Sequence, residues 1–214
     1  MLFWIDLILN GLLFLFGIIG CVREYKREGI KITRYYTFDS NVLGMIAGGC
    51  MFLTLILGLR ENLSVGSVVI PISEAVLLPQ WVMIFKYIAT GCLTLTFLVV
   101  IFVLCPMMGG YKEGLIKENL IYQHTLCPII AIVSFLIFDP TLTFSWQAVI
   151  WAWIPTVIYA VVTIILNVLK LLEGPYPFLY VYRQPWYASV AWGIGIVGAD
   201  FLMVLGLLAL KQVL

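Results

Sequence analysis

The chain has 214 residues, of which 63% are hydrophobic and 11% are charged, and its mean hydropathy is +1.10. Soluble domains carry about a quarter charged residues, so this composition excludes a soluble fold and indicates an integral membrane protein. The 12 basic and 11 acidic residues nearly balance, which excludes the basic surface needed to bind nucleic acid. The length suits one transmembrane domain over residues 1–214.

A helix needs roughly 20 apolar residues to cross a bilayer. Apolar runs of about that length, bounded by charged or turn residues, predict an all-α polytopic bundle of about six transmembrane helices: Leu2–Val22, Thr37–Leu59, Trp81–Leu104, Leu120–Phe138, Trp146–Leu169 and Trp186–Leu210. Three of these runs begin with tryptophan, whose amphipathic ring favours the headgroup region. The connection Arg60–Gln80 is itself half apolar and is expected to lie along the membrane surface.

Basic residues in the connections predict the orientation, because Lys and Arg are retained on the cytoplasmic side. The opposite side holds only Arg60 and Lys211, so both termini are expected to be non-cytoplasmic. The first, third and fifth connections hold the following basic residues: Arg23, Lys26, Arg27, Lys31, Arg34, Lys112, Lys117, Lys170 and Arg183.

Polar residues inside apolar runs are the candidates for function, because each needs a partner in hydrocarbon. They form two predicted layers. The cytoplasmic layer holds Thr37, Asp39, Ser40, Asn41, Gln123, His124 and Asn167, and the outer layer holds Asp6, Asn10, Lys86, Asp139 and Asp200. Because the second and fourth spans start from the same side, Thr37 and His124 are expected at similar depth.

A hydroxyl beside a neutral imidazole is the minimum for nucleophilic acyl transfer, since the imidazole accepts the hydroxyl proton as the oxygen attacks. Thr37 and His124 are therefore a candidate nucleophile and general base. Local sequence leaves other roles open. Thr37 can simply cap the following helix, and His124 can be an interhelical hydrogen-bonding residue. The segment Asp39-Ser40-Asn41 can cap or bridge helices, or it can orient His124 and donate to an oxyanion.

Three segments, Tyr35–Asn41, His124–Ile130 and Tyr176–Leu179, resemble landmarks, in the same order, of the androgen-induced-gene family of membrane hydrolases. The resemblance implies a six-helix hydrolase of fatty acid esters of hydroxy fatty acids, with Thr37 and His124 as its catalytic pair. Asp39-Ser40-Asn41 is closer to a shorter microbial branch of that family. The expected partners are a fatty acyl ester substrate and membrane lipids.

No cofactor is expected. His124 is the only histidine, which excludes a multi-histidine metal site, and the five cysteines form no C-x-x-C pair. The sequence Gly193-Ile194-Gly195-Ile196-Val197-Gly198 matches a dinucleotide motif but lies in an apolar run, so close helix packing is the expected reason for its glycines. Gly44–Gly48 is likewise expected to be a helix contact face. The sequence does not indicate the oligomeric state.

The alternative function is a small transporter or channel that uses Asp6, Lys86 and Asp200 as an intramembrane charge relay, since buried ionisable residues often mark ion or proton paths. A third possibility is a membrane scaffold without catalysis.

Overall fold

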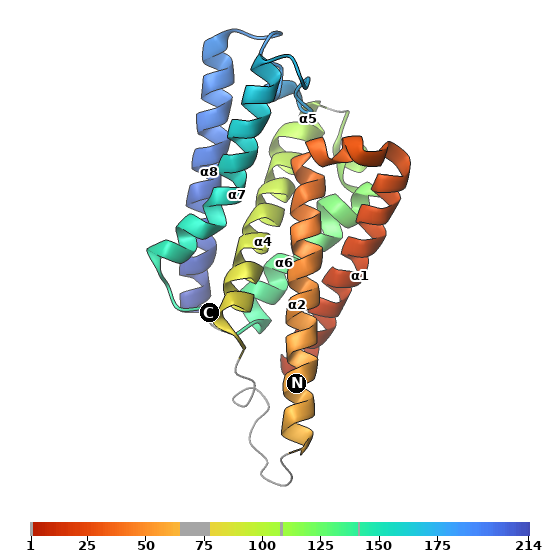
Figure 1. The fold of residues 1–214 in the computed structure, drawn as a ribbon, viewed down its shortest axis with the longest axis vertical. Helices are drawn as coiled ribbons and strands as arrows, with labels where there is room; N and C mark the ends of the chain where they lie inside the picture. Colours follow the sequence, from red (N-terminus) through yellow and green to blue (C-terminus); the bar gives the residue numbers. More distant parts are fainter. Residues whose placement is uncertain (1, 65–77, 108, 141) are drawn as a thin grey trace.

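The computed structural model describes residues 2–64, 78–107, 109–140 and 142–214, and all regular structure in these ranges is helical (Figure 1). The α-helices are α1 Leu2–Glu28, α2 Tyr36–Ser64, α4 Gln80–Val99, α5 Cys105–Met107, α6 Cys127–Val133, α7 Trp146–Val168 and α8 Trp186–Val213. Short 3₁₀ turns are η1 Gly29–Arg34 and η6 Pro177–Leu179, and π-helical segments are η2 Val100–Leu104, η3 Lys112–Ile116, η4 Ile121–Leu126 and η5 Ser134–Phe138.

Six helical stretches of the described chain are long and apolar enough to cross a membrane, which confirms the predicted all-α bundle. Their boundaries agree closely with the apolar runs. Trp146 and Trp186 are the first residues of α7 and α8, and Trp81 is the second residue of α4. The predicted surface segment within the connection from Arg60 to Gln80 falls largely on residues 65–77, which lie outside the described residues.

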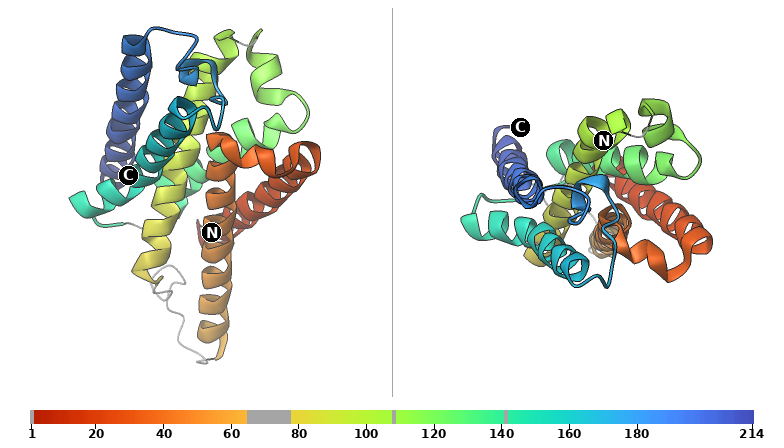
Figure 2. Two further views of the ribbon diagram at one scale, coloured as in Figure 1. Left: turned by 45° about the horizontal axis from the view of Figure 1, so that its top comes forward. Right: turned by 90° about the horizontal axis from the view of Figure 1, so that it is seen from above.

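Helix α4 lies at the centre of the bundle, where it contacts α2, α6, α7 and α8 (Figure 2). In its most apolar window 61% of the residues are buried inside the protein, against 22% for α7 and for α8. The outer helices therefore present apolar side chains such as Ile158 and Leu202 to the surroundings, as expected for helices that face lipid.

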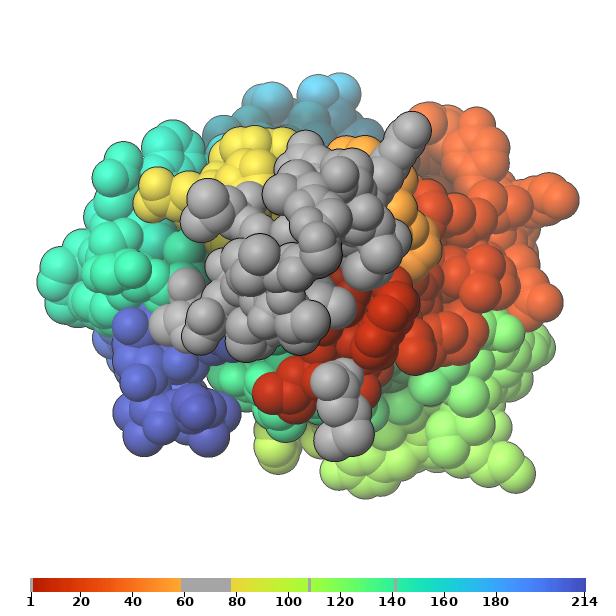
Figure 3. Space-filling model, turned by 90° about the horizontal axis from the view of Figure 1, so that it is seen from below, coloured from red at the N-terminus to blue at the C-terminus, as the bar shows by residue number. Residues whose placement is uncertain are grey.

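The chain ends lie toward the same end of the bundle, which Figure 3 shows with α1 in red and the end of α8 in blue. The connections α1–α2, α5–η4 and α7–α8 lie at the opposite end, which we call the basic end because it carries Arg23, Lys31, Lys112 and the other basic residues of the first, third and fifth connections. Thr37 and His124 both lie near this end, as the alternation of the spans predicts.

The two glycine-rich segments differ in their packing. A Cβ at Gly44 would lie 2.5 Å from Leu93 Cδ1, and one at Gly48 would lie 3.0 Å from Leu13 Cγ, so the predicted contact face on α2 is confirmed. The same expectation for Gly195 and Gly198 is wrong, because a Cβ at either position would meet no atom within 4 Å. These residues are exposed on the outer face of α8, where no described helix packs against them.

Candidate active site

Thr37 lies in the first turn of α2 and is paired with a tyrosine from the α7–α8 connection. The backbone N–H of Thr37 donates to the phenol oxygen of Tyr176 at 3.2 Å, and the two hydroxyls are also hydrogen-bonded at 3.2 Å. The Thr37 side chain thus hydrogen-bonds a distant residue, and it accepts no hydrogen bond from an amide of its own helix in the described structure.

Aromatic packing fixes the position of Tyr176. Its ring stacks on Phe178 at a centroid distance of 5.2 Å and meets the edge of Tyr35 at 5.9 Å. The side-chain amide of Asn167 donates to the carbonyl oxygen of Leu179 at 2.9 Å and so ties the connection to the end of α7. Burial raises the pKa of Tyr176 to about 12, so its phenol is neutral at physiological pH and is able to donate a hydrogen bond.

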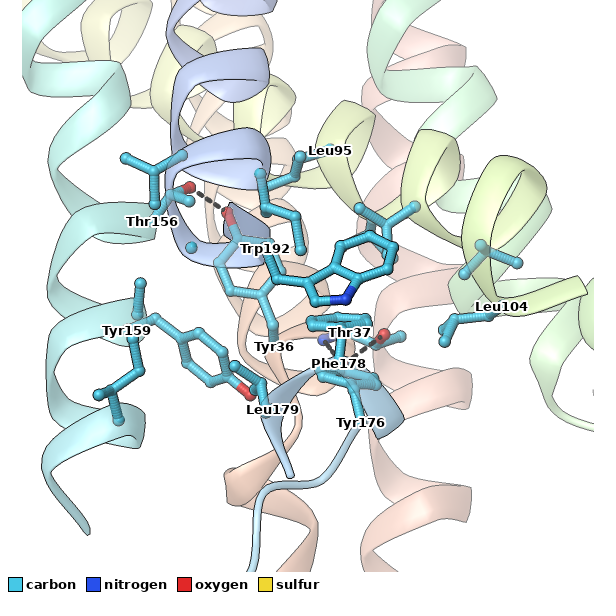
Figure 4. Close-up of a pocket in the computed structure, with 18 residues that line it drawn as sticks. Tyr36, Thr37, Leu95, Leu104, Thr156, Tyr159, Tyr176, Phe178, Leu179 and Trp192 are labelled. Atoms are coloured by element: carbon cyan, nitrogen blue, oxygen red, sulfur yellow. Dashed lines mark hydrogen bonds between the residues drawn. The ribbon is translucent and has the colours of Figure 1, made fainter. Parts of the chain in front are cut away.

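The hydroxyl of Thr37 opens onto an apolar groove between α4, α7 and α8 (Figure 4). Tyr36, Tyr159 and Tyr176 also line it, and each of their hydroxyls is hydrogen-bonded within the protein. The Tyr36 hydroxyl is hydrogen-bonded to Thr156 at 2.7 Å, and the Tyr159 hydroxyl donates to the carbonyl oxygen of Arg34 at 2.7 Å. Apolar side chains make up most of the remaining wall: Leu95, Val99, Val100, Leu104, Ile164, Phe178, Trp192, Ile196 and Val197. The groove, which we call the Thr37 groove, therefore combines one hydroxyl with an apolar wall, and its volume of about 60 Å³ is small.

His124 lies in the π-helical segment η4, four residues before Pro128. Because proline has no N–H, it cannot make the α-helical hydrogen bond to the carbonyl of His124, and π-helical turns occur frequently at functional sites. The Nδ1 atom of His124 lies 2.6 Å from the carbonyl oxygen of Gly114. A carbonyl only accepts, so in the neutral ring the proton is on Nδ1 and Nε2 is the free base. Nε2 has no hydrogen-bond partner among the described residues.

Asn41 connects the two halves of the candidate site. Its Nδ2 donates to the carbonyl oxygen of Thr37 at 2.8 Å and to that of Gln123 at 3.0 Å, so these two oxygens are no further apart than the sum of the two bonds. Thr37 and His124, both described, share no hydrogen bond, and His124 does not line the Thr37 groove. The structure thus brings their backbones near each other and leaves their side chains with other partners.

The remaining residues of the predicted triplet differ in their surroundings. The Ser40 hydroxyl donates to the Thr37 carbonyl at 3.0 Å and is hydrogen-bonded to Thr96 of α4 at 2.8 Å, so it bridges helices. Asp39 lines a separate groove between α2 and α7 and makes no hydrogen bond with Thr37 or His124.

Asp6 and Lys86 belong to one buried polar cluster. Lys86 Nζ donates to Asn10 Oδ1 at 2.5 Å and to Ser134 Oγ at 2.9 Å, and it lies 3.8 Å from Asp139 Oδ2. Asn10 Nδ2 in turn donates to Asp6 Oδ1 at 2.7 Å and to Asp139 Oδ1 at 3.1 Å. The cluster connects α1 and α4 to η5 and the turn that follows it.

Asp200, the third residue of the predicted relay, lies apart from this cluster. It is buried on α8 near Tyr36 and Thr156 and makes no hydrogen bond with Lys86. Lys86 instead pairs with Asp139, which the sequence analysis places in the same outer layer.

In the described ranges no three of His, Cys, Asp and Glu lie close enough to hold a metal ion.

Two groups of the candidate site, Tyr176 and the Gly114 carbonyl, have no role predicted from the sequence. Tyr176 was visible as part of the Tyr-Pro-Phe-Leu landmark, and its distance of 139 residues from Thr37 concealed the contact. The Gly114 carbonyl left no signal, because a backbone acceptor is present at every position.

In comparisons with known proteins, no family model, no curated protein and no solved structure matches this chain.

Proposed function

We propose that this chain is an intramembrane hydrolase of lipid esters, with Thr37 as nucleophile and His124 as general base. The observation that carries the proposal is the position of the Thr37 hydroxyl, which lies beside a neutral phenol at an apolar groove. An amphipathic ester suits such a site, because its carbonyl can lie at the hydroxyl while the first carbons of a chain enter the groove. A longer chain requires the apolar side chains of the groove to move apart, since the groove has a volume of about 60 Å³.

In the proposed reaction, Thr37 Oγ1 forms a bond to the ester carbonyl carbon while Nε2 of His124 takes the hydroxyl proton, directly or through one water molecule. The Tyr176 hydroxyl donates to the oxyanion that develops. Collapse of the intermediate breaks the ester bond, and the leaving alcohol receives the proton from His124. Water then hydrolyses the acyl-threonine. The hydrogen bond from Nδ1 to Gly114 supports this role because it holds the ring in the tautomer whose Nε2 is free.

The motifs that resemble the androgen-induced-gene family support the same pair of residues and suggest fatty acid esters of hydroxy fatty acids as substrates. The distribution of basic residues supports a site in the cytoplasmic leaflet with both termini on the other side. Cysteine accessibility at Lys112 and Leu214 in intact cells tests that orientation, and a carboxyl terminus that is inaccessible from outside would contradict it.

A fluorophosphonate probe that reacts with activated hydroxyls tests the assignment in membranes. We expect the wild type to be labelled and both Thr37→Ala and His124→Ala to lose labelling. Labelling that persists in Thr37→Ala would show that Thr37 is not the nucleophile.

The second candidate function is a transporter or channel with an intramembrane charge relay. Asp6, Asn10, Lys86 and Asp139 hydrogen-bond or pair with one another, which favours a role in holding helices together. Ion-driven flux in vesicles that Asp200→Asn abolishes would favour the transporter.

A further inference from the structure

A second groove lies between α2 and α7, and it shares Tyr36 and Tyr159 with the Thr37 groove. Its volume of about 460 Å³ is within the usual range for ligand sites. Pro155, Ile158, Val162 and Leu166 line it at helical spacing along α7. Such an apolar stripe suits one extended hydrocarbon chain lying alongside the helix.

Two opposite charges, Arg34 and Asp39, line the same groove near the basic end of the bundle. They form no ion pair with each other. The Arg34 guanidinium lies over the ring of Tyr35 at 4.9 Å, and one of its terminal nitrogens donates to the Tyr35 hydroxyl at 3.0 Å. Its Nε is buried and has no hydrogen-bond partner among the described residues. The Asp39 carboxylate likewise makes no hydrogen bond or ion pair within the described ranges.

An unmet buried donor is costly, by about 1–3 kcal/mol, so a ligand that supplies an acceptor to Arg34 gains affinity. An anionic headgroup alone would satisfy Arg34 but would be repelled by Asp39. A headgroup that carries both charges complements both side chains. At a membrane interface the common molecules with this chemistry are zwitterionic phospholipids, whose phosphate is a strong acceptor for a guanidinium.

We propose that this groove binds one phosphatidylethanolamine molecule. Its phosphate accepts hydrogen bonds from Arg34, its ammonium group donates to Asp39, and one acyl chain lies along the apolar stripe of α7. The site is separate from the Thr37 groove, so its occupancy does not depend on whether the chain is a hydrolase.

Native mass spectrometry of the full chain in detergent tests the proposal, with phosphatidylethanolamine and phosphatidylglycerol of identical acyl chains added at equal concentration. We expect the wild type to retain about tenfold more phosphatidylethanolamine than phosphatidylglycerol. Phosphatidylglycerol lacks the ammonium group that donates to Asp39, and the loss of one charged hydrogen bond implies a difference of this size. Arg34→Gln should lower retention of both lipids about tenfold. Asp39→Asn should remove the preference between them. Lys117→Gln, which removes an exposed cation at the same end outside the groove, should leave both values unchanged.

Equal retention by the wild type and Arg34→Gln would overturn the proposal, as would a preference for phosphatidylglycerol in the wild type. Where Arg34→Gln does not fold, Arg34→Lys replaces it. That variant keeps the charge but loses the planar donor set of the guanidinium, and we expect its retention of phosphatidylethanolamine to fall severalfold. Unchanged retention in Arg34→Lys, together with a preference that survives in Asp39→Asn, would also overturn it.

Discussion

Thr37 and Tyr176 lie 139 residues apart in the chain and share two hydrogen bonds of 3.2 Å, one from the Thr37 amide and one between the hydroxyls. The pair joins the first turn of α2 to the connection between α7 and α8. It fixes the hydroxyl of Thr37 at the edge of its groove and places a neutral donor beside it.

Removal of the phenol should impair hydrolysis, because it removes the neutral donor beside Thr37 and the two hydrogen bonds that hold Thr37. We expect Tyr176→Phe to lower the rate of ester hydrolysis about a hundredfold, the effect of losing one oxyanion donor. The assay is ester turnover in purified protein. Tyr182→Phe is the control, because Tyr182 is an exposed tyrosine of the same connection whose hydroxyl donates to the carbonyl oxygen of Val168. An equal loss in the two variants would contradict the role of Tyr176.

The same variant makes a prediction about alkaline stability. Burial raises the pKa of Tyr176 from 10.0 to about 12, so between these pH values the folded state keeps a proton that the unfolded state releases. The corresponding stabilisation is present below pH 10 and is lost as pH rises toward 12. Melting temperatures in detergent at pH 9, 10 and 11 should therefore fall more steeply for the wild type than for Tyr176→Phe. Parallel curves would contradict this.

His124 and Thr125 provide a matched pair for testing the general base. Both side chains hydrogen-bond to η3, His124 to the Gly114 carbonyl at 2.6 Å and Thr125 to that of Leu115 at 2.8 Å. We expect His124→Ala to lower hydrolysis by about 10²–10⁴, the usual contribution of a general base. Thr125→Val removes the neighbouring tether without removing a base, so it should retain activity. Similar losses in the two variants would show that only the tether matters.

Two glycines of α8 test whether the groove holds the substrate chain. Gly193 lines the Thr37 groove, and a Cβ there would lie 3.9 Å from Ile164 Cδ1, whereas one at Gly195 would meet nothing within 4 Å. Gly193→Leu should fill the groove and reduce hydrolysis of long-chain esters more than of short-chain esters. Gly195→Leu gains the same helix propensity and should have no effect. Rates for esters of two chain lengths check this, and an unchanged ratio in Gly193→Leu would place the chain elsewhere.

The buried cluster should contribute to stability and not to chemistry. Lys86→Met removes the cation paired with the Asp139 carboxylate, while Lys211 still donates to the Asp139 backbone carbonyl at 2.6 Å; breaking a buried pair costs about 3–5 kcal/mol. We expect a markedly lower melting temperature, with hydrolysis by the remaining folded protein unchanged. Lys117→Met removes an exposed pair with Glu113 that solvent screens, so the melting temperature should hardly change. Loss of hydrolysis in folded Lys86→Met would assign the cluster a functional role.

The sequence predicted the spans well because each needs a long apolar run, and that signal is local. Trp146 and Trp186 begin helices where their amphipathic rings indicated. Contacts between spans were harder to predict from the sequence. The common depth of Thr37 and His124 followed from the alternation of spans, whereas the bridge through Asn41 depends on rotation of each helix about its axis. The pairing of Lys86 with Asp139 in place of Asp200 depends on the same rotation, which composition does not specify.

The most direct test of the central claim is the site at which a fluorophosphonate probe reacts with the purified chain, mapped by peptide mass spectrometry. The proposed mechanism predicts a phosphonyl adduct on Thr37, lost in Thr37→Ala and strongly reduced in His124→Ala. An adduct on any other residue, or an adduct on Thr37 whose yield is the same in His124→Ala, would contradict it.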